Sequence, residues 1–447
     1  MHRCLITLIS IFALSSQFAF AEEATDGPPT LGEIGATPLV IPPGAAAGPD
    51  FDVDVATEAW LATLPPEAAE RSDAYFEGDY WIQVWDFLIS VLMAWVLLHF
   101  GLSARFRDWG ERVTGSRYIN DAAYLAIYTL VTFVILLPVG IYWGFVREHA
   151  YGLSNQSFAE WMVDGFKGLA ISVVFTSLGA ALLYLVIRKL ARTWWAWGAG
   201  LMVSMLAFGM LIGPVYLAPM FNQFQPLPDG PMRQQILSMA HANGVPADDV
   251  VWSDASRQTD RISANVSGFA GTTRITLNDN LLERSPAASI RLVMGHEMGH
   301  YALNHTYEIL IDIGLIIIGG FLFVNWGFER VRQRWGADWG VSGIGDVAGY
   351  PLFMALITTW FFLMTPVINS MIRSNEIEAD RFSLNAAPEP DGMAFVAMQL
   401  AEYRKIRPGY WEEILFFDHP SGYNRVHMAM QYKAEMLRQQ GVLPPLD

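Results

Sequence analysis

Six apolar segments, each long enough to cross a membrane, constrain this chain more than any other feature of its sequence. A helix needs about 20 mostly apolar residues to cross the hydrocarbon core of a bilayer. Such segments occupy residues 81–102, 122–145, 168–187, 196–220, 309–328 and 350–371. Six helices of this length are hard to bury in one soluble protein of 447 residues, of which only 16% are charged. Soluble domains carry about 25% charged residues. The sequence therefore predicts a mostly α-helical, polytopic protein that contacts the lipid bilayer.

The first 21 residues have the pattern of a secretory signal peptide. A weakly basic start precedes an apolar stretch from Leu5 to Leu14, and Ala19-Phe20-Ala21 provides a small-x-small cleavage site. We expect cleavage after this site, with an uncleaved signal anchor as the alternative.

Residues 22–80 form an acidic segment before the first span. They hold 13 acidic residues and one basic residue, and residues 22–50 contain six prolines and five glycines without a hydrophobic period. This composition is typical of a solvated linker. We therefore expect an acidic linker and pre-membrane segment over 22–80, a four-span membrane domain over 81–220, and a peptidase domain with two further spans over 221–447.

Lysine and arginine in the short loops predict the orientation of the spans, because these residues concentrate on the cytoplasmic side. They fall in alternate loops: Arg105, Arg107, Arg112, Arg117; Arg188, Lys189, Arg192; and Arg330, Arg332, Arg334. This alternation puts residues 221–308 and the C-terminal tail outside the cytoplasm. The expected location is a bacterial inner membrane, with the active site facing the periplasm.

Charge and cysteine content exclude several functional classes. The formal net charge of −16 argues against nucleic acid as a partner. The single cysteine, Cys4, lies within the signal-like segment. The rest of the chain therefore has no disulfide framework, cysteine zinc site or catalytic cysteine.

The polar stretch 221–308 ends in the most informative motif of the sequence. We expect a helix over 231–243, a β-hairpin from Arg261–Gly268 and Arg274–Leu277, and a further helix capped by Ser285. That last helix carries His296-Glu297-Met298-Gly299-His300, an HExxH motif. Positions i and i+4 share a helix face, so the two imidazoles can bind one metal ion while Glu297 takes a proton from water. The alternative is a surface helix with chance histidines.

A hydrolytic zinc site needs a third protein ligand. His305 is one candidate, but the glycine of an extended His-rich motif is missing, and we expect His305 to be a polar residue near the membrane surface. Glu376 is the better candidate, because two spans separate it from His300 and return the chain to the same side. Asp380 lies one helical turn after Glu376, where it can contact a ligand histidine or the reacting oxyanion. Glu378 is expected to be a solvated acid.

Taken together, these motifs resemble the type 1 CAAX prenyl proteases and their bacterial relatives, which are integral-membrane zinc metallopeptidases. The resemblance covers about residues 81–430. It is carried by HEMGH, by Glu376-x-x-Ala379-Asp380, by Leu137–Lys167, by Ala218–Gly230, and by His419-Pro420 with Arg425. It implies one Zn²⁺ held by His296, His300 and Glu376, Glu297 as the base, and Asp380 as a proton donor or transition-state contact. It also implies a barrel of about six membrane helices that encloses a chamber, with a small α+β zinc-protease domain.

The predicted function is therefore hydrolysis of peptide bonds in protein or peptide substrates. His419, Asp380 and Arg425 are candidate donors to the oxyanion, and Arg425 can instead pair with a carboxylate. The substrate is expected to add as an extended strand along residues 262–268, unless that strand is only scaffold. A zinc-binding membrane scaffold without turnover is one rival function, and quality control of damaged membrane proteins is another.

Overall fold

The computed structural model describes residues 29–112, 115–267 and 273–445. The expected signal peptide therefore lies outside the described residues. Within them, six helices are long and apolar enough to cross a membrane: α3 (Pro66–His99), Arg117–Ala150, α7 (Phe158–Lys189), Trp194–Met220, α12 (His305–Trp335) and Val347–Ala386. Each overlaps one predicted span. The expected polytopic helical architecture is confirmed.

Large apolar side chains cover the outer surfaces of these helices. Examples are Trp85 and Leu92 on α3, Val134 on the second span, and Ile311 and Leu315 on α12, all exposed. In a soluble protein such positions would be polar, so these surfaces fit a hydrocarbon environment.

Two spans contain a proline that is accommodated by a wider turn. α5 (Arg117–Ile141) includes Pro138 and continues through a π-helical turn, Tyr142–Val146, into α6 (Arg147–Ala150). α8 (Trp194–Ile212) continues into a second π-helical turn, Gly213–Leu217, which contains Pro214. Proline removes one backbone donor and clashes with the preceding turn, and a π-helical turn absorbs this disruption without ending the helix.

A small sheet lies between the fourth and fifth spans in sequence. Its four strands follow the order β1 (Phe224–Pro226), β2 (Val250–Ser253), β4 (Arg274–Asn278), β3 (Ala264–Ser267). β2 and β4 are parallel, and the other two pairs are antiparallel. The predicted hairpin is confirmed by the β3–β4 pair, although its turn falls outside the described residues. β3 is an edge strand.

Helices of the same region pack on the sheet and on the last spans. They are α9 (Pro231–Ala242), which confirms the helix expected over 231–243, α10 (Asp279–Arg284), α11 (Ala287–Ala302), α13 (Tyr350–Ala386), α14 (Pro390–Leu400), α15 (Tyr410–Phe416) and α16 (Gly422–Gln439). α11 contacts α13, α14 and β3, and α14 contacts α16. The peptidase half is therefore built around α11.

The described residues before α3 make some contacts with the peptidase half, although residues 29–50 are mostly exposed. α2 (Val53–Leu61) packs on α14 and α16, and Trp60 is 2% exposed. Lys433 Nζ donates to the carbonyl of Ala45 at 2.7 Å, and the amide of Gly35 donates to Leu282 at 2.8 Å. The few apolar residues of this segment find partners only in tertiary structure, so hydrophobic periodicity does not reveal them.

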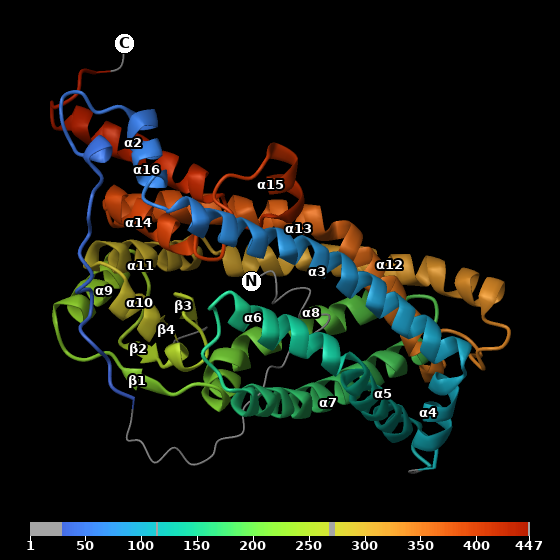
Figure 1. Cartoon of the computed structure of the whole chain (residues 1–447). Helices are drawn as coiled ribbons and strands as arrows, with labels where there is room; N and C mark the ends of the chain where they lie inside the picture. Colours follow the sequence, from blue (N-terminus) through green and yellow to red (C-terminus); the bar gives the residue numbers. More distant parts are fainter. Residues whose placement is uncertain (1–28, 113–114, 268–272, 446–447) are drawn as a thin grey trace.

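The basic loops lie together at the end of the molecule away from the sheet. α4 (Leu102–Gly110) and the turn between α12 and α13 are at that end in Figure 1. Arg107 Nη1 donates to Asp346 at 2.9 Å and joins the two loops, and Arg188 pairs with Asp121 nearby in the fold. Sheet and basic loops thus occupy opposite ends of the helical bundle.

Candidate active site

Two glycines in α11 allow this helix to lie unusually close to α13. A Cβ atom on Gly299 would lie 3.1 Å from the ring of Phe382, and one on Gly295 would lie 3.3 Å from the Cα atom of Ser383. Both distances are tighter than ordinary carbon contacts. This approach brings the histidines of α11 within reach of Glu376 on α13.

The helix itself begins slightly later than expected. Pro286 is its N-cap, and no side chain caps it. Ser285, the expected cap, instead donates a hydrogen bond from Oγ to Gln399 Oε1 at 2.9 Å. The fully buried hydroxyl is thus satisfied by α14, a partner that local sequence does not indicate.

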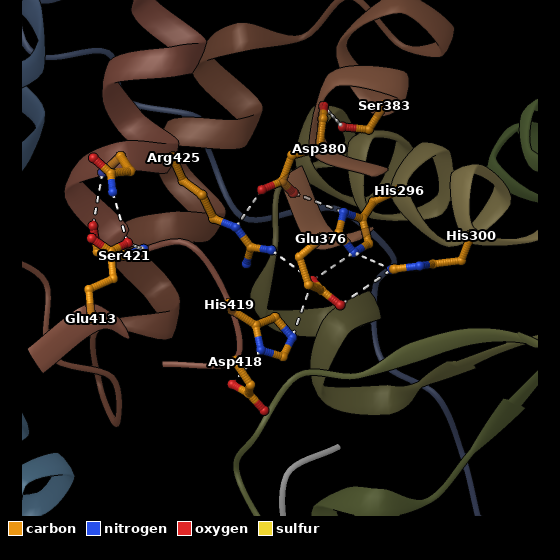
Figure 2. A network of polar contacts seen from close by, with 11 residues as sticks. His296, His300, Glu376, Asp380, Ser383, Glu413, Asp418, His419, Ser421 and Arg425 are labelled. Atoms are coloured by element: carbon orange, nitrogen blue, oxygen red, sulfur yellow. Dashed lines mark hydrogen bonds and ion pairs between the residues drawn. The ribbon is translucent and has the colours of Figure 1, made fainter. Parts of the chain in front are cut away.

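The three predicted ligands converge. His296 Nε2 lies 3.1 Å from His300 Nε2 and 3.3 Å from Glu376 Oε2, and His300 Nε2 lies 3.4 Å from Glu376 Oε1 (Figure 2). Tetrahedral ligands placed 2.0–2.1 Å from a zinc ion are separated by about 3.3 Å. Two imidazoles and one carboxylate with this spacing therefore fit a tetrahedral zinc ion.

Asp380 and Arg425 support these ligands. His296 Nδ1 lies 2.9 Å from Asp380 Oδ1, and Arg425 donates to Asp380 Oδ2 at 2.7 Å and to Glu376 Oε2 at 3.0 Å (Figure 2). If Nε2 of His296 binds the metal, its Nδ1 carries the proton and donates to Asp380. This arrangement favours one of the roles considered for each residue. Asp380 contacts the ligand His296, and Arg425 pairs with carboxylates. An aspartate that accepts from two donors is poorly suited to donate a proton.

His305, the first residue of the α12 span, has a protein partner that the sequence did not indicate. It is 1% exposed, and its Nδ1 lies 2.9 Å from His300 Nδ1. Its Nε2 lies 3.5 Å from Oε2 of Glu378, which is exposed. The chain turns at Asn304, whose φ of 62° is left-handed, and His305, the first residue of α12, then lies beside His300.

These contacts fix one proton arrangement around His300. With Nε2 on the metal, His300 Nδ1 carries the proton and donates to His305 Nδ1. His305 must then carry its own proton on Nε2, which faces the Glu378 carboxylate. His296 thus contacts a carboxylate directly, whereas His300 contacts a second imidazole, that of His305.

Glu297 and His419 complete the group of predicted residues. Burial raises the pKa of Glu297 to about 7, which suits a general base working near neutral pH. His419 Nε2 lies 3.2 Å from Glu376 Oε2, and its Nδ1 lies 2.7 Å from Asp418 Oδ1. Burial also lowers the pKa of His419. The structure thus brings all seven predicted site residues together. Sequence reasoning missed His305 as a ligand partner and Asp418, although Asp418 directly precedes His419.

The helical bundle and this donor set define the class: an integral-membrane metalloprotease whose ligands come from an HExxH helix and from a later helix. The chain belongs to peptidase family M48. The model of that family matches residues 226–433, and the model described as the CAAX prenyl protease N-terminal region with five membrane helices matches residues 56–223.

Individual relatives agree with this assignment. The chain is 28% identical over 350 residues to an uncharacterized metalloprotease, YhfN, of Bacillus subtilis. The match covers 77% of this chain and 82% of the relative. It is 27% identical over 328 residues to CAAX prenyl protease 1 of Saccharomyces cerevisiae, covering 69% of each chain. The crystal structure of Ste24p from S. mikatae has the same fold, with a TM-score of 0.69 at 19% identity, over 84% of this chain and 93% of that one.

Proposed function

We propose that this protein is a zinc-dependent endopeptidase that cleaves peptide or protein substrates at the membrane. The observation that carries the proposal is the convergence of His296, His300 and Glu376 with the spacing of tetrahedral zinc ligands, with Glu297 next to them. A purely structural zinc site needs the ligands but has no use for a base in this position.

The residues of the site divide the chemistry among themselves. When bound, zinc polarises the scissile carbonyl and makes water more acidic. Glu297 accepts a proton from the attacking water and then donates it to the departing amine. His419 faces Glu376 through Nε2 and is placed to donate to the developing oxyanion. Arg425 and Asp380 hold the ligands in position.

The edge strand β3 offers a place for the substrate. Among the described residues it pairs only with β4, and it contacts the metal-binding helix α11. A peptide can add to such an edge through backbone hydrogen bonds, which hold an extended chain without requiring a particular sequence.

A direct assay separates this function from a non-catalytic zinc scaffold. The purified full-length chain is incubated with casein or a quenched peptide, with and without a zinc chelator. We expect cleavage that the chelator abolishes and added zinc restores. A zinc-loaded, folded chain that cleaves none of these substrates would support the scaffold instead.

The physiological substrate is a separate question. Several relatives are named CAAX prenyl proteases, and quality control of membrane proteins uses the same chemistry. Mass spectrometry of newly formed protein termini, comparing cells that carry the wild-type chain with cells that carry Glu297→Gln, distinguishes the two. Cleavage near prenylated C-termini indicates CAAX processing, whereas cleavage of many unrelated membrane proteins indicates quality control.

The raised pKa of Glu297 predicts a specific pH profile. The base accepts a proton only when it is ionised, and burial raises its pKa to about 7 before any metal is bound. A bound cation favours the carboxylate and lowers this value. We therefore expect kcat/KM to fall about tenfold per pH unit on an acid limb that lies below pH 7. A limb centred well above pH 7 would contradict Glu297 as its source.

The positive-inside pattern predicts which side each end of the molecule faces. We propose that the sheet and active site face the periplasm and that the basic loops face the cytoplasm. Single cysteines at two exposed positions, Ala337→Cys and Gln440→Cys, report on the two ends in a chain from which Cys4 is removed. An impermeant thiol reagent on intact cells should label the second cysteine and spare the first. The reverse pattern would place the active site in the cytoplasm.

A further inference from the structure

A small pocket lies beside the metal site and is not used by the mechanism above. Its wall contains Phe76 of α3, Leu400 at the end of α14, and Phe417 after α15. His419 and Arg425 also line it. Because His419 Nε2 is 3.2 Å from the ligand Glu376, the pocket adjoins the metal site.

Three cationic side chains line the pocket, and two of them are neutralised by neighbours. Lys405 pairs with Glu77 at 2.5 Å and with Glu412 at 3.0 Å. Arg425 pairs with Asp380 and Glu376, as described above. Both therefore have little remaining capacity to bind an anion.

Arg404 is different. It lines the same pocket and is half-buried, yet across the described residues no carboxylate lies within ion-pair distance of it and no hydrogen bond occupies its guanidinium. The one acidic residue among the pocket's lining residues, Asp418, is engaged by His419 Nδ1 at 2.7 Å. A guanidinium next to apolar walls is a common binding group for carboxylates, because its planar fork donates two parallel hydrogen bonds.

We propose that Arg404 binds a carboxylate of the substrate, with the adjacent apolar wall contacting the residue that carries it. The carboxylate can be the C-terminal group of a peptide or the side chain of Asp or Glu, since both present the same planar anion. This inference rests on the proposed peptidase function. It adds a preference for substrates with a negative group a short distance from the scissile bond.

The test measures binding separately from cleavage. Fluorescently labelled peptides are titrated onto the zinc-loaded, full-length Glu297→Gln chain. Each peptide has a matched pair without the charge: C-terminal acid against amide, and Asp or Glu against Asn or Gln at successive positions. We expect at least one acidic peptide to bind about tenfold more tightly than its neutral partner, as for a hydrogen bond to a charged group. The acid-to-amide pair and the side-chain pairs show which source of carboxylate is used.

Variants of Arg404 then show whether this residue causes the preference. Arg404→Gln should bring the affinity ratio close to one, and Arg404→Lys should restore part of it. Arg407→Gln is the matched control, because Arg407 lies on the same loop but is exposed and pairs with Glu58 outside the pocket. It should keep the full ratio.

Two results would overturn the inference. One is a ratio near one for every peptide pair on the chain with Arg404 intact, and the other is a high ratio that persists in Arg404→Gln. Cleavage of the same peptides by the wild-type chain is scored independently. Arg404-dependent binding without cleavage would count against the peptidase function and leave the carboxylate site standing.

Discussion

Replacement of Glu297 by glutamine is expected to lower turnover by about a thousandfold or more while bound zinc stays at one ion per chain. The amide cannot accept a proton from water, and general-base catalysis contributes about 10²- to 10⁴-fold. Glu297 is not among the three clustered ligands, and glutamine has nearly the same volume. Peptide hydrolysis and zinc content are measured on the same purified sample.

Glu435→Gln is the matched control for this experiment. It makes the same chemical change in an exposed carboxylate of α16 that lies outside the ligand set, so turnover should remain within a fewfold of wild type. Near-normal turnover in Glu297→Gln would mean that another group activates the water.

Loss of the third ligand should have the largest effect on the metal. Glu376→Ala leaves two imidazoles without the carboxylate that faces both of them. It also removes a partner of the buried Arg425 guanidinium. We expect the purified variant to contain little zinc and no measurable activity.

His305→Ala should behave differently, because His305 contacts the ligand His300 through Nδ1 and does not belong to the ligand set. Loss of such a supporting partner costs about 10- to 100-fold in metal affinity. The variant should therefore bind one zinc ion at high zinc concentration and lose it to a weaker chelator than wild type does. Metal analysis and chelator competition measure both quantities. A His305 variant without zinc, together with a Glu376 variant that keeps it, would reverse the ligand assignment.

Much of this site could be predicted from sequence because its signals are local or depend on simple counting. The i and i+4 spacing of His296 and His300 fixes both on one helix face. Glu376 follows from the even number of spans after His300, because two crossings return the chain to the starting side. The long apolar runs locate the spans, since burial in lipid requires length and apolarity whatever the helices contact.

The remaining features depend on contacts between distant segments. Trp60 is nearly fully buried against helices formed more than 300 residues later, and no local pattern in an acidic, proline-rich stretch indicates this. His305 lies beside His300 after a turn at a single left-handed residue, Asn304. Asp418 contacts His419 in a loop whose conformation is set by α15 and α16. Ser285 lost its predicted capping role to a hydrogen bond with Gln399.

The division of the metal ligands between α11 and α13 has a consequence for biosynthesis. HEMGH leaves the ribosome first, and Glu376 follows only after α12 and most of α13 have been made. The nascent chain therefore holds two donors and no complete metal site while its last spans enter the bilayer. α2, made near the start, must also wait for α14 and α16 before it can pack. Hydrolytic capacity thus arises only once synthesis is nearly finished, so a prematurely terminated chain is left inert in the membrane.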